Sequence, residues 1–200
     1  DYQKAGGEVV AKVQTSGAKH IAIHGANLSG VAAAEAAYGA LLRNWRMDKY
    51  RTKLAETSKP TVTAVTVVGA NDEAVAAWPR YAAIADGVAL TRELVAEPSN
   101  IIYPESFVER CMHLAEMGVE ITVLDVPAME KLGMGALLGV GQGSRRPSRM
   151  LAMKWDGTGG AQERPVAFVG KGVTFDTGGI SSKPAANMED MKWDIGGAGA

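Results

Sequence analysis

Residues 169–194, VGKGVTFDTGGISSKPAANMEDMKWD, carry the pattern that decides the fold of this chain and its chemistry. They follow a short apolar run, VAFV at 166–169, of the kind that is buried in a sheet. Glycines on both sides of Lys171 allow the backbone to pass close to another group. Ligands of open α/β sheets lie at strand ends, so we expect a binding site in the loop after 166–169.

Four charged residues give this loop its chemistry: Lys171, Asp176, Lys183 and Asp194. Carboxylates and a lysine on flexible backbone at a strand end are typical of a hydrolytic site that binds divalent metal ions. The same residues also fit a polar loop in which Lys171 and Asp176 form an ordinary solvated ion pair. Chemistry alone leaves both interpretations open.

Nucleotide binding is a weaker interpretation of the same glycines. The phosphate-loop pattern requires a glycine where Pro165 stands, and a serine or threonine where Gly172 stands. The dinucleotide fingerprint requires a third glycine, but Val-Thr-Phe follows Gly172. Both patterns therefore fail at residues that their phosphate contacts require.

The segment resembles the signature of the leucine aminopeptidase (cytosol aminopeptidase) family in residue types and spacing. The likeness rests on Gly-Lys-Gly-x-x-Phe-Asp-Thr-Gly-Gly, on Lys-Pro and on Met-Lys-x-Asp. It continues upstream in residues 92–100 (RELVAEPSN) and 132–144 (LGMGALLGVGQGS). Asn187 stands where a glycine is common, but asparagine also tolerates left-handed backbone. Ser182 replaces a usual aliphatic residue.

The resemblance implies a role for each of five residues. Asp176 would bridge two divalent metal ions, and Lys171 and Asp194 would bind one of them. A lysine can do so only as a neutral amine. Lys183 would be the catalytic residue, a cation that stabilises the oxyanion of the reacting carbonyl. Met191 would line the pocket for the first side chain of the substrate.

The function implied by the resemblance is that of a metal-dependent aminopeptidase. Such an enzyme releases N-terminal amino acids, leucine-like ones preferred, from peptides through water activated by two metal ions. Mn²⁺ is the first expectation for the cofactor, with Zn²⁺, Mg²⁺ and Co²⁺ as alternatives. The expected partners are peptides with a free N-terminus and further copies of the chain in a homo-hexamer. The alternative is a non-catalytic DNA- or nucleotide-binding regulatory module on the same fold.

We expect this chain to be a fragment of such an enzyme. The family supplies further metal-binding carboxylates and an arginine from an Asn-Thr-Asp-Ala-Glu-Gly-Arg segment that these 200 residues do not contain. The chain also opens on Asp1, so we expect its N-terminal domain to be incomplete. The expectation is that the parent protein is active and that the 200-residue piece is inactive by itself.

Composition and charge argue against several other classes. Lys and Arg number 21 against 22 Asp and Glu, a net charge of -1, which disfavours a nucleic-acid footprint. No apolar run reaches the roughly 18 residues of a membrane span. Cys111 is the single cysteine and cannot form an internal disulfide, so we expect a buried thiol and a reducing, cytoplasmic location.

Residues 1–77 are expected to form a small α/β domain, which the resemblance makes macro-domain-like. Helices are predicted over 3–16 and 31–45, the second capped by Ser29. The strands are predicted at 19–24 and at the β-branched run 61–68. A linker helix over 79–96, within the linker 78–97, then ends before Pro98.

Residues 98–200 are expected to form the first part of an α/β aminopeptidase domain with a mixed sheet. A helix should begin at Pro104, with Phe107 and Cys111 facing inward, and stop at Gly118. Further predicted elements are strands at 121–126, 150–155 and 166–169, and short helices at 127–132 and 187–194. The loop between the last two strands is too short for a crossover, so those strands should pair antiparallel.

Overall fold

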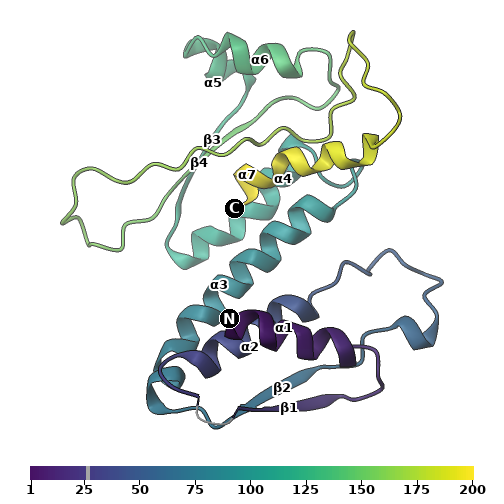
Figure 1. Cartoon of the computed structure of the whole chain (residues 1–200). Helices are drawn as coiled ribbons and strands as arrows, with labels where there is room; N and C mark the ends of the chain where they lie inside the picture. Colours follow the sequence, from purple (N-terminus) through teal and green to yellow (C-terminus); the bar gives the residue numbers. More distant parts are fainter. Residues whose placement is uncertain (26–27) are drawn as a thin grey trace. The chain divides into compact units, whose positions relative to one another are not determined.

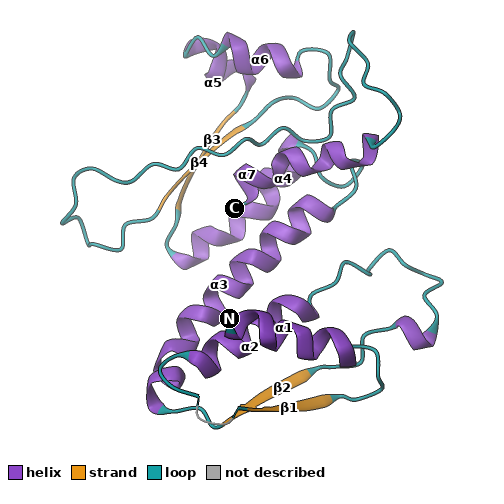
Figure 2. Cartoon of the chain, in the orientation of Figure 1, coloured by secondary structure: helices purple, strands orange, loops and turns teal. Residues whose placement is uncertain are grey.

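The computed structural model describes residues 1–25 and 28–200, which form two compact units. Unit 1 is residues 1–93 and unit 2 is residues 94–200. Figure 1 shows the course of the chain, and Figure 2 shows helices combined with a small sheet in each unit. The fold class is therefore α/β, as the sequence predicts. The finer division into 1–77, 78–97 and 98–200 stays a prediction.

Unit 1 follows the predicted order of helix, strand, helix and strand. Its elements are α1 (Tyr2–Val13), β1 (His20–His24), α2 (Ala32–Asn44), η1 (Glu56–Ser58), β2 (Ala64–Val68) and most of α3 (Asp72–Ala96). The two strands are parallel, with His20 opposite Ala64 and His24 opposite Val68. Parallel neighbours need a crossover connection, and α2 lies within it.

Helices α1 and α2 pack at unusually close range. A methyl group added at Gly6 would overlap the carbonyl oxygen of Ala36, and one added at Gly39 would overlap that of Gln3. Only glycine lets the two backbones approach this far. Val10, on α1, is 0% exposed, so this contact is part of the core of unit 1.

The starts of α2 and α3 differ from the sequence expectation. Ser29 does not cap α2 with its side chain; instead its carbonyl oxygen accepts a bond from the Ala32 amide at 3.2 Å. Helix α3 begins seven residues before Pro79, because the side chain of Asn71 accepts a bond from the Ala74 amide at 2.8 Å. Pro79 therefore lies inside the helix rather than at its start.

Unit 2 combines short helices with an antiparallel pair of strands. Its elements after α3 are α4 (Pro104–Cys111), η2 (Met112–Met117), β3 (Glu120–Leu124), α5 (Val126–Lys131), α6 (Gly135–Gly141), β4 (Met150–Lys154), η3 (Met188–Ile195) and α7 (Gly196–Gly199). Strand β3 pairs with β4, with Glu120 opposite Lys154 and Leu124 opposite Met150. The predicted helix stop is confirmed, because Gly118 has a left-handed φ of 88°. Helix α6 was not predicted.

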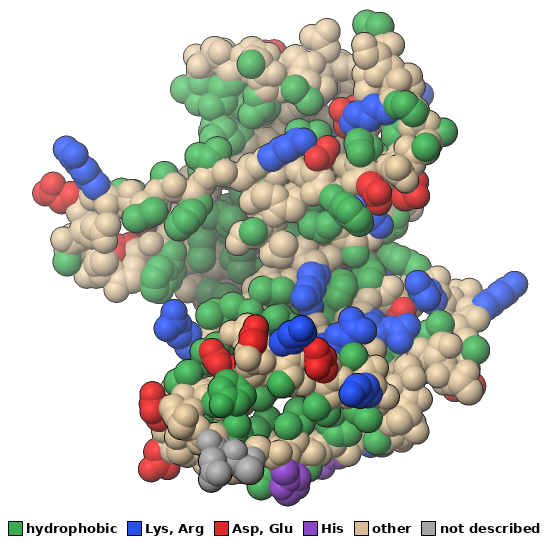
Figure 3. Space-filling model, viewed as in Figure 1, with side chains coloured by type: hydrophobic (Ala, Val, Ile, Leu, Met, Phe, Trp, Pro, Cys, Tyr) green, Lys and Arg blue, Asp and Glu red, His purple; other side chains and the backbone are tan. Residues whose placement is uncertain are grey.

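The strand predicted at 166–169 is wrong. The structure assigns no strand there, and β4 pairs with β3 instead. The side chains of Val166, Phe168 and Val169 are 73%, 93% and 98% exposed, so the run lacks the burial that stabilises a strand. Figure 1 shows the connection from β4 to η3 as a long loop, and Figure 3 shows hydrophobic side chains at the surface of unit 2.

The core of unit 2 contains side chains from several elements. Among its fully buried residues are Leu94, Ile102, Met129 and Ile195. Phe107 and Cys111 are 8% and 3% exposed, which confirms their predicted inward position, and burial raises the pKa of the Cys111 thiol. Glu97 is also buried and pairs with Arg110 at 2.7 Å. In the part of the chain that the structure describes, no helix has the length and apolar character that crossing a bilayer requires.

Candidate active site

The four charged residues predicted from the sequence form two ion pairs. Lys171 Nζ lies 2.8 Å from Asp194 Oδ1. Lys183 Nζ donates to the backbone oxygen of Asp176 at 2.8 Å and lies 3.5 Å from its Oδ2. The lysine that pairs with Asp176 is thus Lys183, and not Lys171 as in the solvated-pair interpretation of the sequence.

Asp176 lies among groups that favour its ionised form. The pKa of its carboxyl is lowered, first by the bond that Oδ1 accepts from the Gly178 amide at 2.8 Å. Partial burial opposes the shift, while the positive charges of Lys183 and Lys171 add to it. Lys171 is the last of these contributions, which places the Lys171–Asp194 pair in the neighbourhood of Asp176. An ionised carboxylate is the form that binds a metal ion.

A tight turn brings Lys183 back to Asp176. Gly178 and Gly179 have left-handed φ values of 99° and 62°, a conformation that glycine adopts without strain. The amide of Lys183 donates to the carbonyl of Thr177 at 2.9 Å, which closes the turn. Residues 177–183 therefore form a closed turn that returns the lysine to the aspartate.

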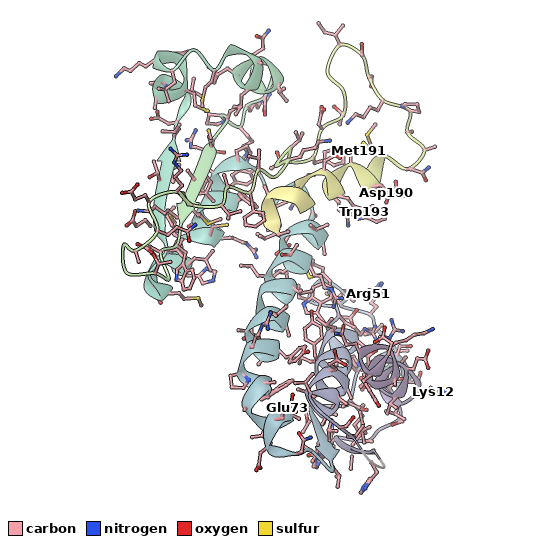
Figure 4. All side chains as sticks on the ribbon, turned by 60° about the vertical axis from the view of Figure 1, so that its left-hand side comes forward. Lys12, Arg51, Glu73, Asp190, Met191 and Trp193 are labelled. Carbon is pink, nitrogen blue, oxygen red and sulfur yellow. The ribbon has the colours of Figure 1, made fainter. Side chains whose placement is uncertain are left out.

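Helix η3 positions the remaining two candidates. It begins after Asn187, which has a left-handed φ of 59°, as the tolerance of asparagine for that conformation predicts. Met191 and Asp194 lie three residues apart on η3 and are both partly buried. Ile195, 1% exposed, anchors the end of the helix in the core. Figure 4 shows Met191 on this helix with Asp190 and Trp193.

The donor atoms fit a divalent metal ion in kind but form only part of a site. Two carboxylates and an amine suit a hard or borderline cation. In its ion pair with Asp194, Lys171 is an ammonium and must lose a proton before it can bind a metal. Residues 1–25 and 28–200 contain no group of three or more His, Cys, Asp or Glu side chains arranged to hold a metal ion.

A segment that was not predicted from the sequence, α7, lies against the Lys171 loop. The carbonyl of Lys171 accepts a bond from the Ala198 amide of α7 at 2.9 Å. A methyl group added at Gly170 would overlap the carbonyl oxygen of Gly197. The glycines around Lys171 did predict a close approach, and the paired glycines after Ile195 were the available signal for its partner.

Residues 89–200 match the catalytic domain of the cytosol aminopeptidase family. The chain belongs to the cytosol aminopeptidase family. Among curated cytosol aminopeptidase relatives, a probable cytosol aminopeptidase of Caulobacter vibrioides is 52% identical over 84% of this chain. One of Rhizobium etli is 48% identical over the whole chain. The chain spans 34% and 41% of the lengths of these two relatives.

Two solved structures are similar to this chain over 99% of its length. The bottromycin maturation enzyme BotP in complex with Mn is 31% identical, with a TM-score of 0.79 over 41% of that chain. A mutant of tomato leucine aminopeptidase is 26% identical, with a TM-score of 0.80 over 39% of that chain. The fold and the family predicted from the sequence are thereby confirmed.

Proposed function

We propose that the protein to which this chain belongs is a metal-dependent aminopeptidase. It would release N-terminal amino acids, leucine-like ones preferred, from peptides with a free N-terminus. The observation that carries the proposal is the cluster formed by the Lys171–Asp194 and Lys183–Asp176 pairs. Membership of the cytosol aminopeptidase family and the likeness to an Mn-bound enzyme support it.

Each clustered residue takes one part of this function. Asp176 and Asp194 would contribute carboxylate oxygens, and Lys171 a neutral amine, as ligands of a pair of divalent ions. Mn²⁺ is the preferred candidate for these ions. Bound ions of this kind supply Lewis-acid polarisation of a carbonyl and acidify a water molecule. Lys183 would remain a cation and stabilise the negative charge that develops on the scissile carbonyl oxygen. Met191 would line the pocket for the first substrate side chain.

The 200-residue chain alone is proposed to be inactive. Two carboxylates and one amine are too few ligands for two ions that each need several oxygen donors. A homo-hexameric assembly and a cytoplasmic location remain parts of the proposal, and the family name supports the second of them. DNA binding is not proposed, since a net charge of -1 means that there is no excess of positive charge to bind phosphates.

The first test is hydrolysis of leucine p-nitroanilide by the full-length protein. Activity should appear with Mn²⁺ and disappear with a chelator. Lys183→Ala should lower kcat by about a hundredfold or more, because charge stabilisation at the scissile carbonyl is lost, while the bound manganese is unchanged, because Lys183 is not a proposed ligand.

The matched control is Lys154→Ala. That lysine pairs at the surface of β4 with Glu120 at 3.6 Å, so kcat should not change. Unchanged turnover in Lys183→Ala would remove Lys183 from the mechanism. Absence of hydrolysis with every metal would contradict the aminopeptidase proposal itself.

A further inference from the structure

Two glycine-rich segments meet in a close backbone contact beside Lys171. The first segment is residues 170–172, Gly-Lys-Gly, and the second is residues 196–199 of α7, Gly-Gly-Ala-Gly. A methyl group added at Gly170 or at Gly197 would collide with the opposite backbone. The one at Gly197 would lie 2.9 Å from the amide nitrogen of Lys171. Contacts below about 3 Å require a shift of one segment.

A third glycine makes a different kind of contact. A methyl group at Gly172 would lie 2.9 Å from the side-chain Cβ of Ala198. The amide of that same Ala198 donates to the carbonyl of Lys171 at 2.9 Å. Any residue larger than glycine at 172 must therefore push α7 away from the loop and strain this hydrogen bond.

The two segments carry the two ends of one ion pair. Lys171 belongs to the first, and Asp194 lies just before the second, joined to it by the buried Ile195. The 2.8 Å distance between Lys171 Nζ and Asp194 Oδ1 thus depends on how closely the two backbones approach. Both side chains are partly exposed, at 59% and 34%, so side-chain packing alone does not fix them.

We propose that Gly170, Gly172 and Gly197 are positioning residues that hold Lys171 against Asp194 as ligands of one metal ion, through a contact that has no room for side chains. The inference rests on the proposed function, because it assigns these two residues to a common ion. The glycines touch neither metal nor substrate, and they act through the backbone that bears the ligands. Mutation of groups that orient metal ligands typically lowers metal affinity by about 10- to 100-fold.

The test compares Gly172→Ala with the double variant Gly172→Ala/Ala198→Gly in the full-length protein. Titration with Mn²⁺, followed by the electron paramagnetic resonance of the unbound ion, counts the sites and measures each Kd. Gly172→Ala should weaken one of two sites by about tenfold or more. The double variant should bind within about twofold of the wild type, because removal of the Ala198 methyl group relieves the collision.

Two further variants sharpen the result. Gly170→Ala should weaken the same site more, and Ala198→Gly should not rescue it, since its collision is with a backbone oxygen. Gly139→Ala, on α6, is the control, because a methyl group there meets nothing within 4 Å, and both Kd values should stay unchanged. Hydrogen exchange of the Ala198 amide gives a readout without metal. Its protection should fall in Gly172→Ala, and the amide of residue 198 should regain it in the double variant.

The outcomes separate this inference from the proposed function. Wild-type Mn²⁺ affinity at both sites in Gly172→Ala, or failure of Ala198→Gly to restore it, would overturn the positioning role while the aminopeptidase proposal stands. Unchanged exchange of the Ala198 amide in Gly172→Ala would also overturn it. A wild-type protein that binds none of Mn²⁺, Zn²⁺, Mg²⁺ and Co²⁺ would refute the proposed function, and the metal-positioning role with it.

Discussion

Two regions of the molecule differ in which of their residues are buried. One is the α1–α2 pair of unit 1, and the other is the connection from β4 to η3 in unit 2, residues 155–187. Along α2, small residues are buried, with Ala36 and Ala40 at 6% and 0% exposure. In the connection, the larger and more apolar Phe168 and Val169 are 93% and 98% exposed. Apolar character therefore predicts burial only where a partner surface of matching shape is present.

The charged cluster of the candidate active site draws on both kinds of structure. Asp176 and Lys183 lie in the exposed connection and are held by turn geometry, namely the Gly178 amide and the closed turn at Thr177. Asp194 lies beside the buried Ile195. The candidate residues on the loop thus lie beside one that is held by a packed element, and rigid scaffolds commonly position binding loops in this way.

The largest expected effect is Gly39→Ala in the α1–α2 contact. The added methyl group would overlap the Gln3 carbonyl, so one helix must shift and the unfolding free energy should fall by about 3 kcal/mol. Urea denaturation measures the change. Gly87→Ala in α3 is the control, because its methyl group meets nothing within 4 Å. That variant should gain roughly 0.5–1 kcal/mol, since alanine favours helix over glycine. A loss of the same size in both variants would mean that the close contact is not the cause.

The second prediction compares the same substitution, valine to alanine, in the buried α1–α2 contact and in the exposed connection. Val10 is 0% exposed and Val169 is 98% exposed. Val10→Ala should lower the unfolding free energy by about 2 kcal/mol through lost burial and an unfilled cavity. Val169→Ala should stay within about 0.5 kcal/mol of the wild type, as exposed substitutions usually do. The urea midpoints of the two variants check this, and a costly Val169→Ala would show that residues 166–169 are packed after all.

Sequence reasoning succeeded where a local pattern and its burial agree. The β-branched run at 61–68 contains β2, and Pro104 and Gly118 bound the predicted helical stretch. It failed where the outcome depends on competing or distant partners. Pro79 suggested a helix start, but Asn71 provides an earlier cap. The run 166–169 has strand-forming residues, yet β4 pairs with β3 and not with this run.

For the candidate active site, the sequence predicted residue types better than their pairing. The glycines beside Lys171 indicated a close backbone approach, and the structure identifies α7 as the partner. Spacing along the chain could not reveal that Lys171 pairs with Asp194 while Lys183 folds back to Asp176. Those pairings depend on the turn at Gly178 and on the packing of α7, neither of which is local to the lysines.

The smallest expected effect lies in the turn at residues 156–160, at the start of the exposed connection, which is ordered by polar contacts rather than burial. Asp156 Oδ1 accepts from Thr158 Oγ1 at 2.6 Å and from the Thr158 amide at 2.8 Å, and Oδ2 accepts from the Gly160 amide at 2.9 Å. These bonds lower the pKa of the Asp156 carboxyl, the Thr158 hydroxyl contributing most. Thr158→Val should raise that pKa toward the ordinary aspartate value, because valine keeps the shape and the amide but removes the hydroxyl.

The direction of the pH effect follows from linkage. The pKa of Asp156 is lower in the folded than in the unfolded state, so its bonds stabilise the loop above the ordinary aspartate pKa. That contribution is lost as the pH falls through the lowered value, and in Thr158→Val the loss should begin at higher pH. The carboxyl chemical shift of Asp156, followed by NMR during acid titration, measures this pKa in the wild type and in Thr158→Val. Thr122→Val on β3 is the control and should leave the pKa of Asp156 unchanged. If the pKa of Asp156 is the same in Thr158→Val as in the wild type, the backbone amides alone order residues 156–160.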